Sequence, residues 1–100
     1  MILITLTAKL FAEHRDSTLA AAQTMSAHSL AEPGCLDYRF WISTEDPSAI
    51  LLLERWEDQA ALDAHMAAPQ LAEFAAALGP ALDGGMEATK FEVASSGPLF

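Results

Sequence analysis

The residue types best suited to acid–base chemistry lie in one short stretch of the chain, between Glu54 and His65. An imidazole beside a carboxylate can act as a general base, because its pKa lies near physiological pH. Side chains alternate between the two faces of a strand, so Glu54 and Trp56 are expected to share a face. His65 follows on a predicted helix that can bring its ring close to them. We therefore interpret His65 and Glu54 as candidate catalytic residues beside the indole of Trp56.

Each of these side chains also has an ordinary structural interpretation. A single histidine on an alanine-rich helix often packs or makes a hydrogen bond without a catalytic role. Glu54 could instead form an ion pair with Arg39 or Arg55. Trp56 and Tyr38 could be core residues whose polar atoms are hydrogen-bonded. The residues alone leave both interpretations open.

Several other kinds of site lack their sequence signatures. The three histidines, His14, His28 and His65, fall in different segments without carboxylates at metal-ligand spacing. The chain has no glycine-rich phosphate loop and no Gly-x-Ser-x-Gly elbow. Cys35 is the only cysteine, so it forms no intrachain disulfide, and it lacks the surroundings of an activated thiol. We therefore predict no metal site, no nucleotide site and no cofactor.

The composition indicates one acidic domain formed by residues 1–100. Fourteen acidic against five basic residues give a net charge of −9, which repels polyanions, so nucleic acid and anionic membranes are poor partners. No apolar run approaches the roughly 20 residues of a membrane span, and the first residues lack the features of a secretory signal. A single cysteine suits a reducing compartment. We expect a cytoplasmic protein.

Periodicity places the candidate residues within six or seven elements. Alternation predicts strands over 2–10, 35–44 and 86–94, and a continuously apolar start predicts another from Ile50 that carries Glu54 and Trp56. Helical spacing predicts helices from an N-cap at 16 or 17 to 31, from the N-cap Asp58 to about 67, and from Pro69 to a break at Gly79-Pro80. Gly84-Gly85 is expected to precede the last strand. The order β-α-β-β-α-β predicts a ferredoxin-like α+β fold with an antiparallel sheet.

Both faces of the two middle strands are apolar. Trp41 alternates with Phe40, and Leu51 and Leu53 alternate with Leu52. A chain of this length covers only one sheet face with helices, which leaves the other face wet unless a partner covers it. We therefore predict a homodimer that buries sheet face against sheet face. A pure interaction module, which pairs with a different protein, would expose the same face.

A pocket is expected between the sheet and its helices. In the strand over 35–44, alternation places Tyr38 and Phe40 on one face and Cys35 on the other. The predicted substrate-binding residues are Trp56, Tyr38, Phe40, Leu62 and Phe74. Such a lining suits a small aromatic ligand if the pocket is open. If the same side chains fill it, the protein is a packed, non-catalytic one.

Three segments resemble the antibiotic biosynthesis monooxygenase-like family of dimeric α+β barrel proteins. They are Glu32-Pro-Gly-Cys-Leu-Asp-Tyr38, the run from Leu53 to His65, and residues 69–74. The resemblance spans nearly the whole chain. It implies a homodimer in which the sheets of two ferredoxin-like subunits pack into a barrel, with a separate pocket in each subunit.

The resemblance also implies a chemistry. Some relatives oxygenate quinols or polyketide phenols without metal or flavin, because a deprotonated, electron-rich phenol can itself pass an electron to molecular oxygen. By resemblance His65 would be the base or proton shuttle, Trp56 and Tyr38 the pocket walls, and Glu54 a polar relay.

The chain departs from two patterns seen among relatives of this family. Relatives that degrade haem look as if they depend on an asparagine in the first strand. This chain contains no asparagine, which disfavours haem degradation. Gln70 stands where many relatives have a histidine after the proline. The leading hypothesis is a cofactor-independent monooxygenase for a small aromatic, quinol-like or polyketide-like substrate. The alternative is a non-catalytic dimeric small-molecule-binding or stress-related protein of the same fold.

Overall fold

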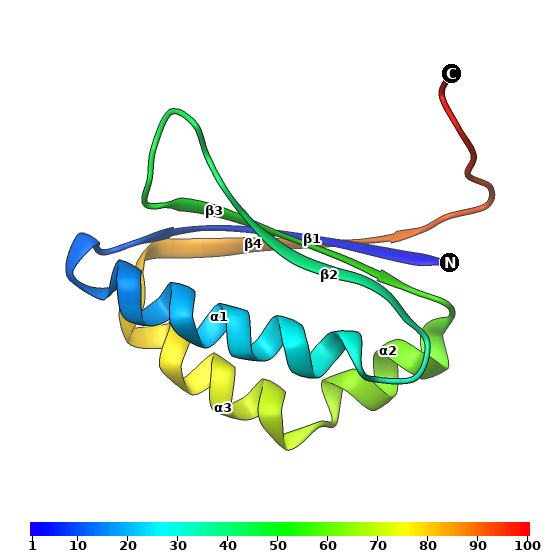
Figure 1. Cartoon of the computed structure of the whole chain (residues 1–100), viewed down its shortest axis with the longest axis horizontal. Helices are drawn as coiled ribbons and strands as arrows, with labels where there is room; N and C mark the ends of the chain where they lie inside the picture. The colour runs from blue at the N-terminus through cyan, green and yellow to red at the C-terminus, as the bar shows by residue number, and fades with distance from the viewer.

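A four-stranded antiparallel sheet carries every helix on one of its faces (Figure 1). The computed structural model describes residues 1–100. The strands are β1 (Ile2–Leu10), β2 (Cys35–Ile42), β3 (Ala49–Trp56) and β4 (Leu82–Glu92), in the spatial order β2-β3-β1-β4. The helices are α1 (Arg15–Leu30), α2 (Gln59–Met66) and α3 (Pro69–Leu78), with the 3₁₀ turns η1 (Ala12–His14) and η2 (Gly79–Ala81). This architecture confirms the predicted ferredoxin-like α+β fold.

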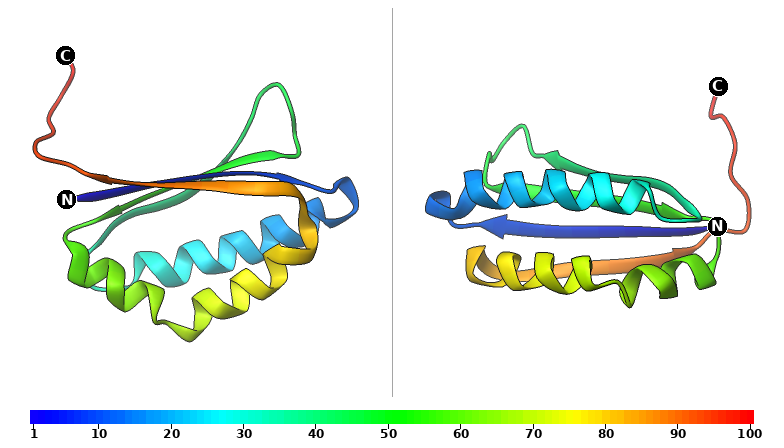
Figure 2. Two further views of the ribbon diagram at one scale, coloured as in Figure 1. Left: turned by 180° about the vertical axis from the view of Figure 1, so that it is seen from behind. Right: turned by 60° about the horizontal axis from the view of Figure 1, so that its bottom comes forward.

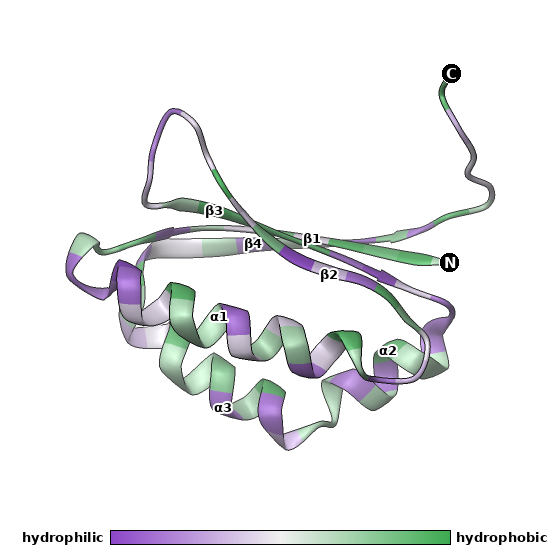
Figure 3. Cartoon of the chain, in the orientation of Figure 1, coloured by the Kyte–Doolittle hydropathy of each residue, from purple (hydrophilic) through white to green (hydrophobic).

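The sheet has one covered face and one open face, and both views of Figure 2 place the helices on the same side of it. In β1, the alternating residues from Ile2 to Ala8 face the helices. Leu6 pairs with Leu52 of β3 on one side and with Ala88 of β4 on the other. The loop between β2 and β3 is largely hydrophilic, whereas β1 and β3 are largely hydrophobic (Figure 3). The alternation of β1 therefore sets which side of the sheet becomes the core.

Two predicted helix starts are correct and one is wrong. Asp58 caps α2, because its carboxylate accepts a hydrogen bond of 2.9 Å from the amide of Ala61. Pro69 opens α3, as expected for a residue without an amide hydrogen. Helix α1 begins at Arg15 rather than after an N-cap at 16 or 17. The hydroxyl of Ser17 donates to the carbonyl of His14, so it lies inside the first turn.

The last strand begins four residues earlier than predicted. Gly84 and Gly85 lie inside β4, not before it. The register of β4 against β1 shifts between Ala8 and Leu10, and Gly84 has a φ of 99° beside that shift. A glycine with positive φ is typical of a β-bulge, so the glycine pair bends the strand instead of ending it.

A second bulge changes the face on which Cys35 lies. Cys35 pairs with Trp56, and the next paired residue, Asp37, faces Arg55, so Leu36 is an extra residue in β2. The thiol therefore packs against the core on the same side as Tyr38. Simple alternation, which places Cys35 and Tyr38 on opposite faces, is wrong here.

The C-terminal segment lies outside the sheet and the helices. Residues 93–100 leave the sheet as an extended segment that points away from the helices (Figure 1), and the side chains of Leu99 and Phe100 are exposed. None of the helices has the length and apolar content needed to cross a membrane.

Candidate active site

A cavity of about 480 Å³ lies on the helix-covered side of the sheet, between the strands and helices α2 and α3. Its walls are mainly apolar and include Leu6, Leu52, Leu62, Leu71, Phe74, Leu78 and Met86. Two polar groups interrupt them: Tyr38, Glu54 and His65 form one, and Gln59 and Lys90 form the other. A more open hollow of about 590 Å³ lies beside Trp41 and Leu51 and contains none of the candidate residues. The candidate catalytic residues His65 and Glu54 therefore lie in the first cavity.

Strand β3 positions the carboxylate of this site. Glu54 and Trp56 are two residues apart and both face the helices, so the indole nitrogen donates a buried hydrogen bond of 2.9 Å to Glu54 Oε1. Tyr38 stands opposite Glu54 in the pairing of β2 with β3. Both aromatic side chains are fully buried, which holds the carboxylate in one position.

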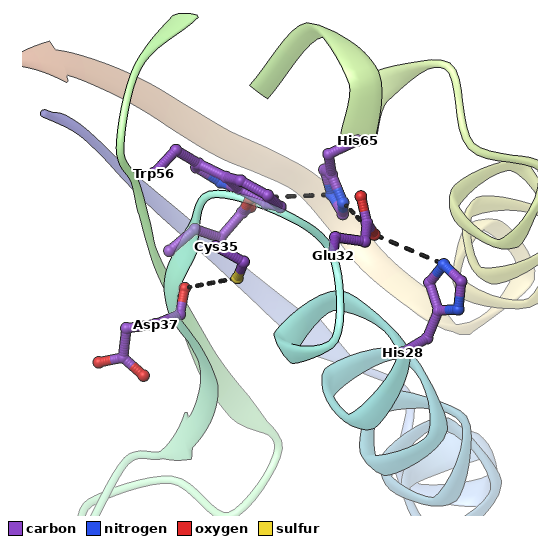
Figure 4. A network of polar contacts seen from close by, with 7 residues as sticks. His28, Glu32, Cys35, Asp37, Trp56 and His65 are labelled. Carbon is purple, nitrogen blue, oxygen red and sulfur yellow. Dashed lines mark hydrogen bonds and ion pairs between the residues drawn. The ribbon is translucent and has the colours of Figure 1, made fainter. Parts of the chain in front are cut away.

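Helix α2 supplies the imidazole from its last turn. His65 Nδ1 lies 3.0 Å from Glu32 Oε1, in the turn after α1 (Figure 4). Because a carboxylate accepts, we assign the hydrogen to Nδ1, and in the neutral ring Nε2 then presents its lone pair. That Nε2 lies 3.8 Å from Glu54 Oε1. The ring is fixed against Trp56, with centroids 4.6 Å apart, and lies 5.4 Å from the ring of Tyr38.

Burial controls the protonation of the acidic groups here. Burial raises the pKa of the Glu54 carboxyl above its usual value, although the indole hydrogen bond and His65 oppose this rise. Burial, reinforced by Glu54, raises the pKa of the Tyr38 phenol further above its ordinary value. The nearby Ser29 hydroxyl opposes that rise, although it forms no hydrogen bond of good geometry. Tyr38 therefore stays neutral and can offer only a hydroxyl.

The thiol of Cys35 is not a nucleophile in this setting. Burial raises its pKa to about 11, and the charges of Glu32 and Glu54 act in the same direction. The thiol donates to the carbonyl of Asp37 at 3.5 Å (Figure 4). At neutral pH it is a protonated, partly buried packing group.

The arrangement is suited to moving a proton. The gap between Glu54 and His65 accommodates one proton on either side chain, and Nε2 of the imidazole can accept another from a hydroxyl in the cavity. No group of three or more His, Cys, Asp or Glu side chains is arranged to hold a metal ion. The cavity walls supply apolar surface for a flat ligand.

The structure brings together most of the predicted site residues. His65, Glu54, Tyr38, Leu62 and Phe74 all line the cavity. Trp56 and Phe40 do not belong to its lining, and they support residues that do. Trp56 lies behind Glu54 and His65, and Phe40 packs edge-on against Tyr38 and Phe74, with centroids 5.9 and 5.6 Å apart. Substrate contact by Trp56 and Phe40 stays a prediction.

The two arginines considered as partners for Glu54 lie on the open face. Arg55 pairs with Asp37 at 3.8 Å, and the guanidinium of Arg39 lies 5.8 Å from the ring centroid of Trp41. Gln70 lines a small groove between α1 and α3 and is not part of the cavity. The side-chain partners of Glu54 are therefore the indole of Trp56 and the imidazole of His65, and neither arginine is among them.

Sequence reasoning gave no role to Glu32 or to Lys90. Glu32 follows α1 in a turn, and its contact with His65 joins residues 33 positions apart, a separation that no local pattern reveals. Lys90 lines the cavity and donates a hydrogen bond of 3.1 Å to Gln59. Period-two alternation from Met86 through Ala88 would have placed Lys90 on this face.

The family is decided by comparison with known sequences. The sequence profile described as "Antibiotic biosynthesis monooxygenase" matches residues 1–77, which is more than half of the chain. The chain belongs to the antibiotic biosynthesis monooxygenase family. This finding confirms the resemblance carried by the segments around Tyr38 and His65.

Two relatives match about two thirds of the chain. The "Putative monooxygenase YcnE" from Bacillus subtilis is 32% identical over 65 residues, which are 65% of this chain and 68% of YcnE. The protein sll1783 from Synechocystis sp. is 34% identical over 62 residues, which are 62% of this chain and only 42% of sll1783.

Solved structures share the fold over nearly the whole chain. A protein from Deinococcus radiodurans, described as a "putative antibiotic biosynthesis monooxygenase", has a TM-score of 0.93 at 22% identity and covers 100% of this chain and 99% of its own. Rv0793 from Mycobacterium tuberculosis has a TM-score of 0.89 at 22% identity, over 97% and 98% of the two chains. These likenesses establish the fold.

Proposed function

We propose that this protein is a cofactor-independent monooxygenase that acts on a small aromatic, quinol-like or polyketide-like substrate. One observation carries the proposal: the Glu54–His65 pair, 3.8 Å apart, is held by buried aromatic rings on the wall of an otherwise apolar cavity. Membership of the monooxygenase family supports the same reaction class. The cavity volume, about 480 Å³, suits a ligand of two or three fused rings.

The reaction needs only a base, a dry pocket and orientation from the protein. His65 Nε2 takes the hydroxyl proton of the bound phenol, with Glu54 balancing the charge of the imidazolium that forms. The electron-rich anion then reacts with molecular oxygen. The reacting ring carbon, which is a methylene in the keto tautomer of such a phenol, loses two hydrogens and gains one oxygen atom as a carbonyl. The second oxygen atom leaves with these two hydrogens as water. No external reductant is required for this balance.

Oxygen uptake by metal-free protein in the presence of a panel of quinols and anthrones tests the function. We expect uptake with at least one compound, and a fall of about 10²-fold or more in His65→Ala, because a positioned base contributes that much. His14→Ala is the matched control, since His14 lies at the start of α1 and not in the cavity. Identical rates in wild type and His65→Ala would remove His65 from the reaction.

The same compounds can also distinguish ligand binding without turnover from catalysis. If fluorescence of the tryptophans reports saturable binding of the same compounds but no oxygen is consumed, the non-catalytic small-molecule-binding function replaces the monooxygenase. The absence of both binding and uptake would contradict both functions.

We also propose that the open sheet face forms the homodimer. Trp41 and Phe91 are 52% and 46% exposed on this face, and Leu51 and Leu53 are half-buried beside them. Surface of this kind is costly in water and is suited to a second copy of the same sheet. Sedimentation should give about twice the monomer mass of 10.7 kDa, and Trp41→Asp should give monomers that stay folded. A monomeric wild type would contradict this assembly.

A further inference from the structure

We propose that Glu32 and His28 form, with His65, a relay that exchanges protons between the cavity and the solvent. In this relay Glu32 is a positioning residue for His65, and His28 is the terminus at the surface. The use of the relay in catalysis rests on the proposed monooxygenase function. The relay itself is a property of the resting protein and can be measured without substrate.

A single carboxylate oxygen lies between the two imidazoles. Glu32 Oε1 is 3.0 Å from His65 Nδ1 and 3.5 Å from His28 Nε2 (Figure 4). His28 stands in the last turn of α1, one helical turn before Glu32, while His65 comes from α2. The end of α1 and the turn that follows it thus place the Glu32 carboxylate and the His28 imidazole on the Nδ1 side of the His65 ring, away from Glu54.

Exposure rises in order along this chain of groups. The side chain of His65 is 1% exposed, that of Glu32 is 14% exposed, and that of His28 is 33% exposed. The buried imidazole meets the cavity on its Nε2 side and Glu32 on its Nδ1 side. A ligand that fills the cavity covers the first side, so the second side is the route that stays connected to water.

The contact with Glu32 also fixes the tautomer that catalysis needs. A carboxylate at Nδ1 holds the ring hydrogen there and leaves the lone pair of Nε2 facing the cavity. The same carboxylate places an acceptor 3.0 Å from the nitrogen that must give up its hydrogen when Nε2 takes a proton. Glu32 therefore acts on the ligand only through His65.

Proton transfer through the relay balances without any change of oxidation state. A hydroxyl proton from the cavity adds to Nε2 of His65, and the proton on Nδ1 passes to Oε1 of Glu32. A small rotation of the partly exposed His28 ring shortens the 3.5 Å step, and its Nε2 takes the proton from the carboxyl. The opposite nitrogen of His28 then releases a proton to water. The reverse sequence returns a proton and restores the starting tautomers.

The titratable groups beside the relay come from β2 and β3. Glu54 on β3 and Tyr38 and Cys35 on β2 lie closest to His65 and Glu32. Burial raises the pKa of the phenol and of the thiol, so both stay protonated at neutral pH. Glu54 is the remaining group that can exchange a proton with His65.

The test measures proton exchange at His65 with no substrate present. In protein labelled with ¹⁵N in its histidines, NMR identifies which ring nitrogen carries hydrogen and how fast that hydrogen exchanges with water. We expect Glu32→Gln and His28→Gln to slow this exchange by about tenfold or more, because an amide does not relay a proton. The hydrogen should stay on Nδ1 in both variants, since the amide oxygen of Glu32→Gln still accepts it.

His14→Gln is the control, because it removes a histidine from the opposite end of α1 and should leave exchange at His65 unchanged. Equal exchange rates in wild type, Glu32→Gln and His28→Gln would overturn the relay. If Glu32→Gln does not fold, His28→Gln decides the outcome alone, because its side chain is partly exposed. Slowed exchange in a protein that consumes no oxygen would keep the relay and reject the oxygenase. Oxygen uptake with equal exchange rates would do the reverse.

Discussion

The two faces of one sheet differ in how they treat polar groups. On the helix-covered face, Glu54 is buried, bonded to an indole and paired with an imidazole. On the open face, the charges of Arg55 and Asp37 form a partly exposed pair, and the guanidinium of Arg39 lies over an exposed tryptophan ring. Strand β3 supplies residues to both faces in alternation. Cover by the helices, rather than residue type, therefore determines which carboxylate is available for chemistry.

The two tryptophans differ in exposure in the same way as the two sheet faces. Trp56 is 0% exposed and Trp41 is 52% exposed. Trp56 packs behind Glu54 and His65, and Trp41 lies on the face that we propose as the dimer interface. One tryptophan thus stabilises the subunit, whereas we assign the other to the assembly.

The largest expected effect is the loss of the buried tryptophan. Trp56→Ala should lower the free energy of unfolding by about 3–5 kcal/mol, because it opens a cavity in the core and leaves Glu54 without its indole partner. Chemical denaturation followed by circular dichroism measures the change. A loss below that range would mean that the helices do not pack tightly on this face.

Trp41→Ala is the matched change on the open face. Its cost to the subunit itself should stay within about 0.5 kcal/mol, as is usual for surface positions. Any further loss should grow as the protein is concentrated from the monomeric to the dimeric range, because it reflects weakened association. A large loss that does not depend on concentration would contradict the contrast between the two faces.

A pair of glycines provides a smaller comparison between the helix layer and the sheet edge. Gly34 has a φ of 82°, and a Cβ added there would lie 2.6 Å from the Cβ of Ala61 in α2. Gly84 has a φ of 99° and open space around it. Both alanine substitutions should cost about 1–2 kcal/mol for the left-handed backbone. Gly34→Ala should cost about 1–3 kcal/mol more, because it also pushes against the helix.

Thermal unfolding of the two variants, Gly34→Ala and Gly84→Ala, measures the difference. Equal losses would mean that α2 moves away from the turn without penalty. A larger loss at Gly84 would contradict the assignment of that residue to an uncovered edge strand.

The fold was predictable because its signals are local. The alternation in β1, the cap at Asp58 and the proline at position 69 each act over a few residues, and each one is found where the sequence indicates. The errors occur at the irregularities near Leu36 and Gly84. One extra residue in β2 reverses a period of two, and two extra residues in β4 carry the strand through the glycine pair. Alternation cannot anticipate a bulge unless the turn chemistry is also considered.

The candidate site was predictable only in part. The spacing of Glu54 and Trp56 on one strand indicated their shared face, and the helical position of His65 indicated its direction. The contact of His65 with Glu32 depends on how the end of α1 packs against α2, which is a tertiary fact. Composition and spacing carry no signal for it.

The smallest expected effect concerns charge on the two faces. Burial raises the pKa of Glu54 in the folded protein above its unfolded value, so the folded state holds this proton more firmly. The protonated form thus favours folding at low pH, and that stability is lost as pH rises from the unfolded pKa through the folded one. Glu54→Gln should remove this loss and flatten the dependence of stability on pH, while its amide oxygen still accepts the indole hydrogen bond.

Glu87→Gln removes the same charge from the open face, where Glu87 is exposed in the single subunit, and controls for the change in net charge from −9. Both variants are compared at a concentration at which the subunits are monomeric. Denaturation of both variants between pH 4 and 8 should show a gain for Glu54→Gln that increases with pH and stays smaller than the loss in Trp56→Ala. Glu87→Gln should give no such trend. Parallel curves for the two variants would mean that cover by the helices leaves the protonation of Glu54 unchanged, and the distinction between the two faces would then rest on packing alone.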